Sequence, residues 1–176
     1  IFTTLSSCAS RQLEEVTFRR ATISVPELMA TAGKYFRKVY KGNKAHIDFK
    51  IQPLEGRITG DWNQLRFLLE NLIDEACSVT LDGAVCLSAR EDGEFIRFLF
   101  TDMRREKTRE ELNQLFYPDL SRMTAGEKGE LYGTEYLVCK QIIRDHDEFA
   151  GRRGCRINAE PGKEGGFTIY FTLPKK

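Results

Sequence analysis

The sequence predicts an α+β fold, a two-layer α/β sandwich in which a mixed sheet carries three helices on one face. Two observations predict this class. Segments with helical periodicity alternate with short segments, mostly in pairs, whose apolar residues recur at every second position. In addition, 41% of the 176 residues are hydrophobic, which is enough to fill the core of one domain. Helices gathered on one face of a sheet bury the apolar residues of both layers, as this class requires.

In the first half of the chain, two elements have clear start or orientation signals. The strand expected over 45–52 places His46 on its exposed side, because apolar and polar residues alternate there. The helix expected over 26–40 has Pro26 in its first turn and Ser24 as its N-cap. The remaining elements expected in this half are strands over 17–24 and 57–59 and a helix over 61–80.

The second half contains the longest predicted loop, over 117–133, which includes Pro118 and three glycines. A Glu-Asp-Gly turn signal at 91–93 separates two predicted strands. The elements expected in this half are strands over 84–90, 94–100, 156–159 and 167–173, and helices over 108–116 and 134–149.

We divide the sequence into an N-terminal helix, residues 1–16, and one domain, residues 17–176. The apolar spacing of residues 5–16 predicts an amphipathic helix that ends a longer helix upstream. The sequence starts at Ile1 instead of Met, as expected of a piece of a longer protein. It contains no stretch that approaches the roughly 18 apolar residues of a membrane span, and no signal-peptide pattern.

Charge and cysteine content limit the kinds of partner and compartment. The 27 Lys and Arg residues nearly balance the 26 Asp and Glu residues, so we expect no nucleic acid and no membrane contact from this segment. The five cysteines are widely spaced, which predicts a reducing, cytoplasmic compartment and no disulfide framework. With two histidines, His46 and His146, a His/Cys metal cluster is not expected.

Residues 61–80 read DWNQLRFLLENLIDEACSVT. This segment resembles the N-box helix of histidine-kinase ATP-binding domains, D-x-x-R-L-x-x-x-L-x-N-L-x-x-N-A-x-K-x-T. Its apolar residues form a stripe at helical spacing that packs on a sheet. Asn71, Glu75 and Ser78 are spaced i, i+4, i+7 and share another face.

Four further segments resemble motifs of the same family, in the same order. Residues 100–102 resemble the strand end that begins the D-box, D-x-G-x-G, and 115–120 resemble the F-box. Residues 133–143 are similar to the G-box and its helix, and 162–174 to the ending G-x-G-T-x-F-x-F-x-L-P. The resemblance covers about residues 18–174 and identifies the chain as similar to the catalytic and ATP-binding domain of histidine kinases, a GHKL-type domain with the Bergerat fold.

The resemblance implies a nucleotide site and assigns residues to it. Asn71 and Glu75 stand where the family binds Mg, and Asp102 stands where it accepts a hydrogen bond from the adenine amino group. Gly133 and Lys140 stand in the G-box and its helix, next to the phosphates. The implied cofactors are therefore ATP and Mg.

Several residues depart from the family pattern at this site. Glu75 replaces the Mg-binding Asn and Ser78 replaces a Lys, so that negative charge is added beside a polyphosphate. Arg104 and Glu106 replace the two D-box glycines, whose missing side chains let ligand and backbone approach. Glu135 places a carboxylate where phosphate should lie in a glycine-rich loop. We interpret these departures as a degraded nucleotide site, as in a pseudokinase.

Two other readings of the arginines remain open from the sequence. In one, Asp102 only begins a turn and residues 104–107 form a solvated surface loop. In the other, arginines following the D-box build an anion site of a new kind; these are Arg104, Arg105, Arg109 and Arg122.

The resemblance implies a domain of a two-component sensor histidine kinase. From the departures we expect this domain to be degenerate and to act in signalling through protein contacts. Its expected partners are the dimerisation and phosphoacceptor helices and other domains of the parent sensor, and a response regulator. The alternative is an active Mg-ATP-binding kinase domain with a divergent pocket. It would donate phosphoryl to a His outside this chain, because neither His46 nor His146 lies in a phosphoacceptor motif. An anti-sigma-factor kinase or an ATPase clamp of the same superfamily fits the motifs less well.

Overall fold

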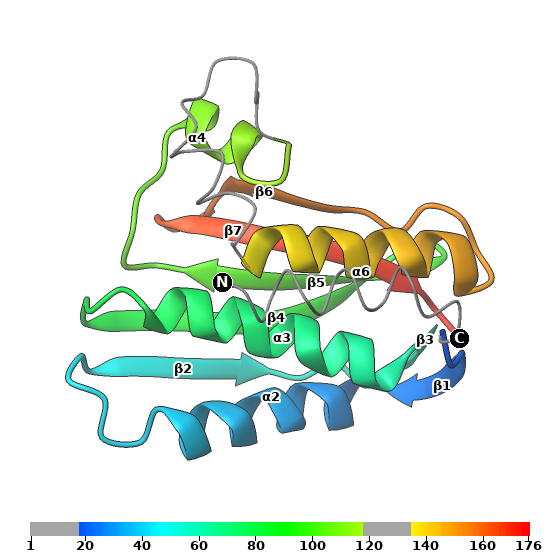
Figure 1. Cartoon of the computed structure of the whole chain (residues 1–176), viewed down its shortest axis with the longest axis horizontal. Helices are drawn as coiled ribbons and strands as arrows, with labels where there is room; N and C mark the ends of the chain where they lie inside the picture. The colour runs from blue at the N-terminus through cyan, green and yellow to red at the C-terminus, as the bar shows by residue number, and fades with distance from the viewer. Residues whose placement is uncertain (1–17, 118–134) are drawn as a thin grey trace.

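A computed structural model describes residues 18–117 and 135–176 of the chain. Figure 1 shows a mixed sheet with the long helices α2, α3 and α6 running across one face. This is the predicted two-layer α/β sandwich, with the core between the sheet and the helices. Among the described helices, none has the length and apolar character needed to cross a membrane.

The elements follow the order predicted from the sequence. The predicted helix over 5–16 and most of the predicted loop over 117–133 lie outside the described residues. The bounds are β1 Ala21–Ser24, α2 Val25–Val39, β2 Ile47–Gln52, β3 Arg57–Gly60, α3 Trp62–Cys77, β4 Gly83–Asp92, β5 Phe95–Asp102, α4 Arg109–Gln114, α6 Glu135–Phe149, β6 Ile157–Pro161 and β7 Phe167–Pro174.

The main sheet has the strand order β2-β4-β5-β7-β6, and β1 pairs with β3 in a separate two-stranded ladder. β2 and β4 are parallel, while the other pairs of the main sheet are antiparallel. β5 is the central strand, and its alternate residues are buried under the helices as far as its last residue. That last residue is Asp102, which therefore points into the layer between sheet and helices.

The starts of α2 and α3 depend on side-chain caps. Ser24 caps α2 as predicted, accepting from the N–H of Glu27 at 3.3 Å. Asp61 caps α3 and accepts from the N–H of Gln64 at 3.1 Å. His46 is exposed, as predicted, and lies directly before β2.

His146 has a structural position that the sequence did not indicate. Its side chain is fully buried in α6, and Nε2 accepts the backbone N–H of Asp61 at 3.0 Å. Its Nδ1 lies 2.8 Å from the carbonyl oxygen of Ile142, so the ring proton belongs on Nδ1. His146 thus ties α6 to the cap of α3.

The turn before β7 presses closely on the end of β5. Gly166 has φ +69°, and a Cβ there would lie 2.1 Å from the carbonyl oxygen of Asp102. Its N–H donates to Oε1 of Glu106 at 2.8 Å. Glycine is therefore required here both by backbone conformation and by lack of space.

We predict that Gly166→Ala lowers the free energy of unfolding by about 2 kcal/mol or more, because strain and a clash with β5 add. Gly93→Ala is the matched control, since Gly93 has φ +61° but open space around its Cβ position. It should cost only about 1 kcal/mol. Urea denaturation measures both, and equal losses would contradict the close approach to Asp102.

Candidate functional site

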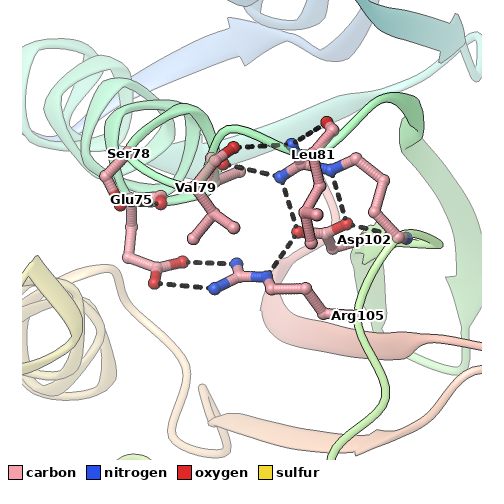
Figure 2. Close-up of polar contacts among 8 residues, drawn as sticks. Glu75, Ser78, Val79, Leu81, Asp102 and Arg105 are labelled. Carbon is pink, nitrogen blue, oxygen red and sulfur yellow. Dashed lines mark hydrogen bonds and ion pairs between the residues drawn. The ribbon is translucent and has the colours of Figure 1, made fainter. Parts of the chain in front are cut away.

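The residues singled out in the D-box and N-box segments meet at the end of the molecule where β5 ends. Asp102 comes from the last position of β5, and Glu75 from the last turn of α3. Arg104 and Arg105 follow Asp102 in the loop that leads toward α4. Figure 2 shows that Glu75, Arg105 and Asp102 lie in one connected set of polar contacts beside the end of α3.

Each carboxylate oxygen of Asp102 accepts two hydrogen bonds. Oδ1 accepts from the backbone N–H of Arg104 at 3.0 Å and from its Nε at 2.9 Å. Oδ2 accepts from Nη2 of Arg104 and from Nε of Arg105, both at 2.9 Å. A carboxylate has about four acceptor positions. The Asp102 side chain, 1% exposed, therefore has no acceptor position left for another donor.

The charge of Asp102 is kept by these contacts. Burial alone would raise the pKa of this carboxyl group. The hydrogen bonds from Arg104 and the positive charges of Arg105 and Arg104 outweigh burial and place the pKa below its ordinary value. Asp102 is thus an ionised carboxylate at neutral pH, neutralised from within the chain.

Arg104 is saturated in the same way, and it caps α3. In addition to its two side-chain contacts with Asp102, its Nη2 donates to the carbonyl of Ala76 at 2.6 Å. Its Nη1 donates to the carbonyls of Val79 at 3.0 Å and Leu81 at 2.8 Å. All five guanidinium N–H groups have partners. Arg104 therefore binds one carbonyl group in the last turn of α3 and two in the turn that follows the helix.

Gly83 makes room for Arg104. A Cβ at Gly83 would lie 2.8 Å from Cγ of Arg104, and its φ of +135° also favours glycine. The Arg104 side chain, 1% exposed, is consequently enclosed between the end of α3 and the start of β4.

Arg105 joins Glu75 to Asp102. Its Nη1 and Nη2 donate to Oε1 and Oε2 of Glu75 at 3.3 and 2.9 Å, a bidentate pair. The side chains of Arg105 and Glu75 are 14% and 19% exposed, so this pair is partly open to water. The pKa of Tyr136 on α6 is raised, mainly by burial and then by the negative charge of Glu75. The phenol therefore stays protonated near the pair.

The hypothesis that residues 104–107 form a solvated surface loop is wrong for Arg104 and Arg105. Arg104 is enclosed and Arg105 is mostly buried, because Asp102, Glu75 and backbone carbonyls supply acceptors for both. Glu106 is exposed, although it accepts the Gly166 N–H. An anion site on Arg104 is likewise contradicted, since its donors are all used; Arg122 lies outside the described residues.

The other predicted site residues are held by local contacts. Asn71 is buried, and its Nδ2 donates to the carbonyl of Phe67 one turn earlier at 2.7 Å. Ser78 donates its hydroxyl to the carbonyl of Glu75 at 2.6 Å. Lys140 donates to the carbonyl of Phe116 at 2.7 Å and lies 4.1 Å from the ring centroid of Tyr117. Glu135 is the first residue of α6, and Gly133 lies outside the described residues.

As arranged here, these residues do not fit ATP and Mg. An adenine amino group needs a free acceptor on Asp102, and a metal ion needs the Glu75 oxygens that Arg105 occupies. Within the described ranges, no group of three or more His, Cys, Asp or Glu side chains is placed to hold a metal ion. The site is a set of mutually neutralising charges.

Comparison with known proteins places residues 60–176 in the sequence family described as histidine kinase-, DNA gyrase B- and HSP90-like ATPase. The adaptive-response sensory kinase SasA of Thermosynechococcus vestitus is 30% identical over 138 residues. That match takes in 77% of this chain and 34% of SasA, so the chain spans about a third of the length of this relative.

Solved structures share the fold. The nucleotide-free catalytic domain of the histidine kinase ThkA matches with a TM-score of 0.66 and 19% identity, over 91% of this chain and 98% of that one. ThkA in complex with the response regulator protein TrrA matches with a TM-score of 0.72 and 18% identity, over 99% of this chain and 47% of that one. At these identities the likeness concerns the fold.

We predict that Arg104→Ala lowers the free energy of unfolding by about 3–5 kcal/mol, because it leaves Asp102 buried with less compensation and uncaps α3. Arg109→Ala removes the same charge from an exposed residue and should change it by less than about 0.5 kcal/mol. Chemical denaturation of both variants is the measurement. Similar effects for the two arginines would show that Arg104 does not hold this end of the fold.

Proposed function

Because the chain belongs to the histidine kinase-, DNA gyrase B- and HSP90-like ATPase family, and within it is a histidine-kinase catalytic and ATP-binding-type domain, we propose that it is a degenerate member, a pseudokinase. It acts in two-component signalling through contacts with other proteins. The observation that carries this proposal is the saturated carboxylate of Asp102, whose four acceptor positions are taken by Arg104 and Arg105.

The energy needed to open the pocket supports the proposal. Nucleotide could use Asp102 only after Arg104 withdraws from it and from the carbonyl groups at the end of α3. Breaking a buried ion pair costs about 3–5 kcal/mol. Since each 1.4 kcal/mol is a tenfold change, the apparent affinity for nucleotide would fall by about 10²–10³ or more. A micromolar site would then be at best a millimolar site.

The alternative function is an active domain with a divergent pocket. Here Glu75 and Asn71 would bind Mg, Asp102 would bind adenine, and the phosphoryl group would pass to a His outside this chain. The partial exposure of the Glu75–Arg105 pair favours this alternative, because that pair can open with less desolvation than the Arg104 contacts. Arg104 remains the obstacle to it.

The proposed role requires other domains and partners. The chain spans about a third of its curated relative, so the phosphoacceptor helices and sensing domains belong to sequence outside it. ThkA, which shares the fold, has been solved with a response regulator, and this supports a response regulator as a partner here too. We place the domain in the cytoplasm, where its free cysteines stay reduced.

We predict that millimolar Mg-ATP leaves the melting temperature of this domain within about 1 °C of its value without ligand. Ligand at 100 times its dissociation constant would add about 2.7 kcal/mol, or about 5–10 °C for a domain of this size. Differential scanning calorimetry with ATP alone, Mg alone and both makes the measurement. A shift of 5–10 °C that Asp102→Ala abolishes would overturn the pseudokinase proposal in favour of the active alternative.

A further inference from the structure

The exposed side of α2 and the turn after it carry five basic side chains. Lys34, Arg37 and Lys38 lie on the helix, and Lys41 and Lys44 lie in the turn before β2; all five are exposed. In Figure 1, α2 is the helix at the lower edge, at the side of the sheet that ends in β2. We call these five residues the α2 basic surface.

The net charge of the whole chain, +1, does not reveal the positive charge of this surface. It holds five of the 27 basic residues and none of the 26 acidic ones, so the rest of the chain carries a net charge of −4. No acidic residue occurs between Leu28 and Ile47 in the sequence. Among the described residues, none of the five basic side chains forms an ion pair.

Helix stability explains only part of this charge. Arg37 and Lys38 lie in the last turn of α2, where positive charge interacts favourably with the helix dipole. Lys34 lies one turn before Lys38 on the same helix face, and like charges at this spacing repel. Lys41 and Lys44 lie beyond the helix end.

An acidic neighbour on α3 is already engaged. Oδ1 of Asp74 accepts from the hydroxyl groups of Tyr35 and Tyr40, at 2.7 and 2.6 Å. These tyrosines connect α2 to α3 and turn the aromatic side of the helix inward. The basic side chains are left facing solvent, where an anionic partner can reach them.

We propose that the α2 basic surface binds an acidic segment of a partner protein. Complementary charge speeds association and selects partners even where each rim pair contributes little affinity. The exposed Val39, 49% accessible, stands among the basic residues and offers the partner an apolar contact. The proposal is independent of the nucleotide question, since none of these residues belongs to the Asp102 network.

Two other kinds of anionic partner, a lipid surface and single-stranded nucleic acid, fit this surface less well. The apolar side of α2, which includes Leu28 and Met29, is packed in the core, so the helix cannot insert into a lipid surface. For single-stranded nucleic acid, exposed aromatic side chains would be needed for base stacking. Here Phe36 and Tyr40 are partly buried and stack on each other, with ring centroids 6.0 Å apart.

Fluorescence anisotropy with a labelled glutamate-rich peptide that contains one central leucine tests the proposal on the folded domain. We expect saturable, salt-sensitive binding that the double change Lys38→Gln and Lys41→Gln weakens by about tenfold. The matched control is Arg152→Gln with Arg153→Gln, which removes the same charge from another exposed pair and should leave binding unchanged. Circular dichroism verifies that both variants fold.

Three results would overturn the proposal. Equal weakening by the two double variants would mean that the peptide senses only net charge. Absence of binding to the wild-type domain would mean that the surface is merely solvated. Tighter binding of anionic lipid vesicles or duplex DNA than of the peptide, lost in the Lys38/Lys41 variant, would assign the surface to a different class of partner.

Discussion

The buried carboxylate of Asp102 is the constraint around which this end of the domain is organised. An ionised group with 1% exposure must be paired and hydrogen-bonded, or the fold loses several kcal/mol. Here Arg104 and Arg105 supply the pairing from the loop that follows. The same guanidinium of Arg104 then reaches the carbonyl group of Ala76 in the last turn of α3, so that the central strand, the loop and the helix end are fixed together.

This arrangement gives the departures from the family pattern a common physical meaning. In the pseudokinase proposal, Glu75 and Arg104 each disfavour nucleotide binding, one by charge and one by bulk. In the structure Glu75 is neutralised by Arg105, and Arg104 by Asp102, so the two changes belong to one set of compensating charges. Glu106, in the same loop, accepts the backbone N–H of Gly166 and so connects this loop to the turn before β7. The five basic side chains of the α2 basic surface lie outside this set.

Much of the fold could be predicted from local patterns, because Ser24, Pro26 and the alternating strands act over a few residues. The site contacts could not, since Glu75 and Arg105 are 30 residues apart and the acceptors of Arg104 are backbone carbonyls that no sequence motif marks. A charged residue after a strand usually faces solvent, and this expectation failed for Arg104. The basic surface of α2 was missed because a net charge of +1 concealed it.

The most direct test of the central claim is the Mg-ATP affinity, by isothermal titration calorimetry, of a variant that combines Glu75→Asn, Arg104→Gly and Glu106→Gly. This variant frees Asp102 from Arg104 and restores the family residues at the three positions. If the ion pairs of Asp102 and Glu75 prevent nucleotide binding, the folded variant binds Mg-ATP saturably and the wild-type domain does not. Equal binding by both proteins, or none by a variant that circular dichroism shows to be folded, would contradict the account.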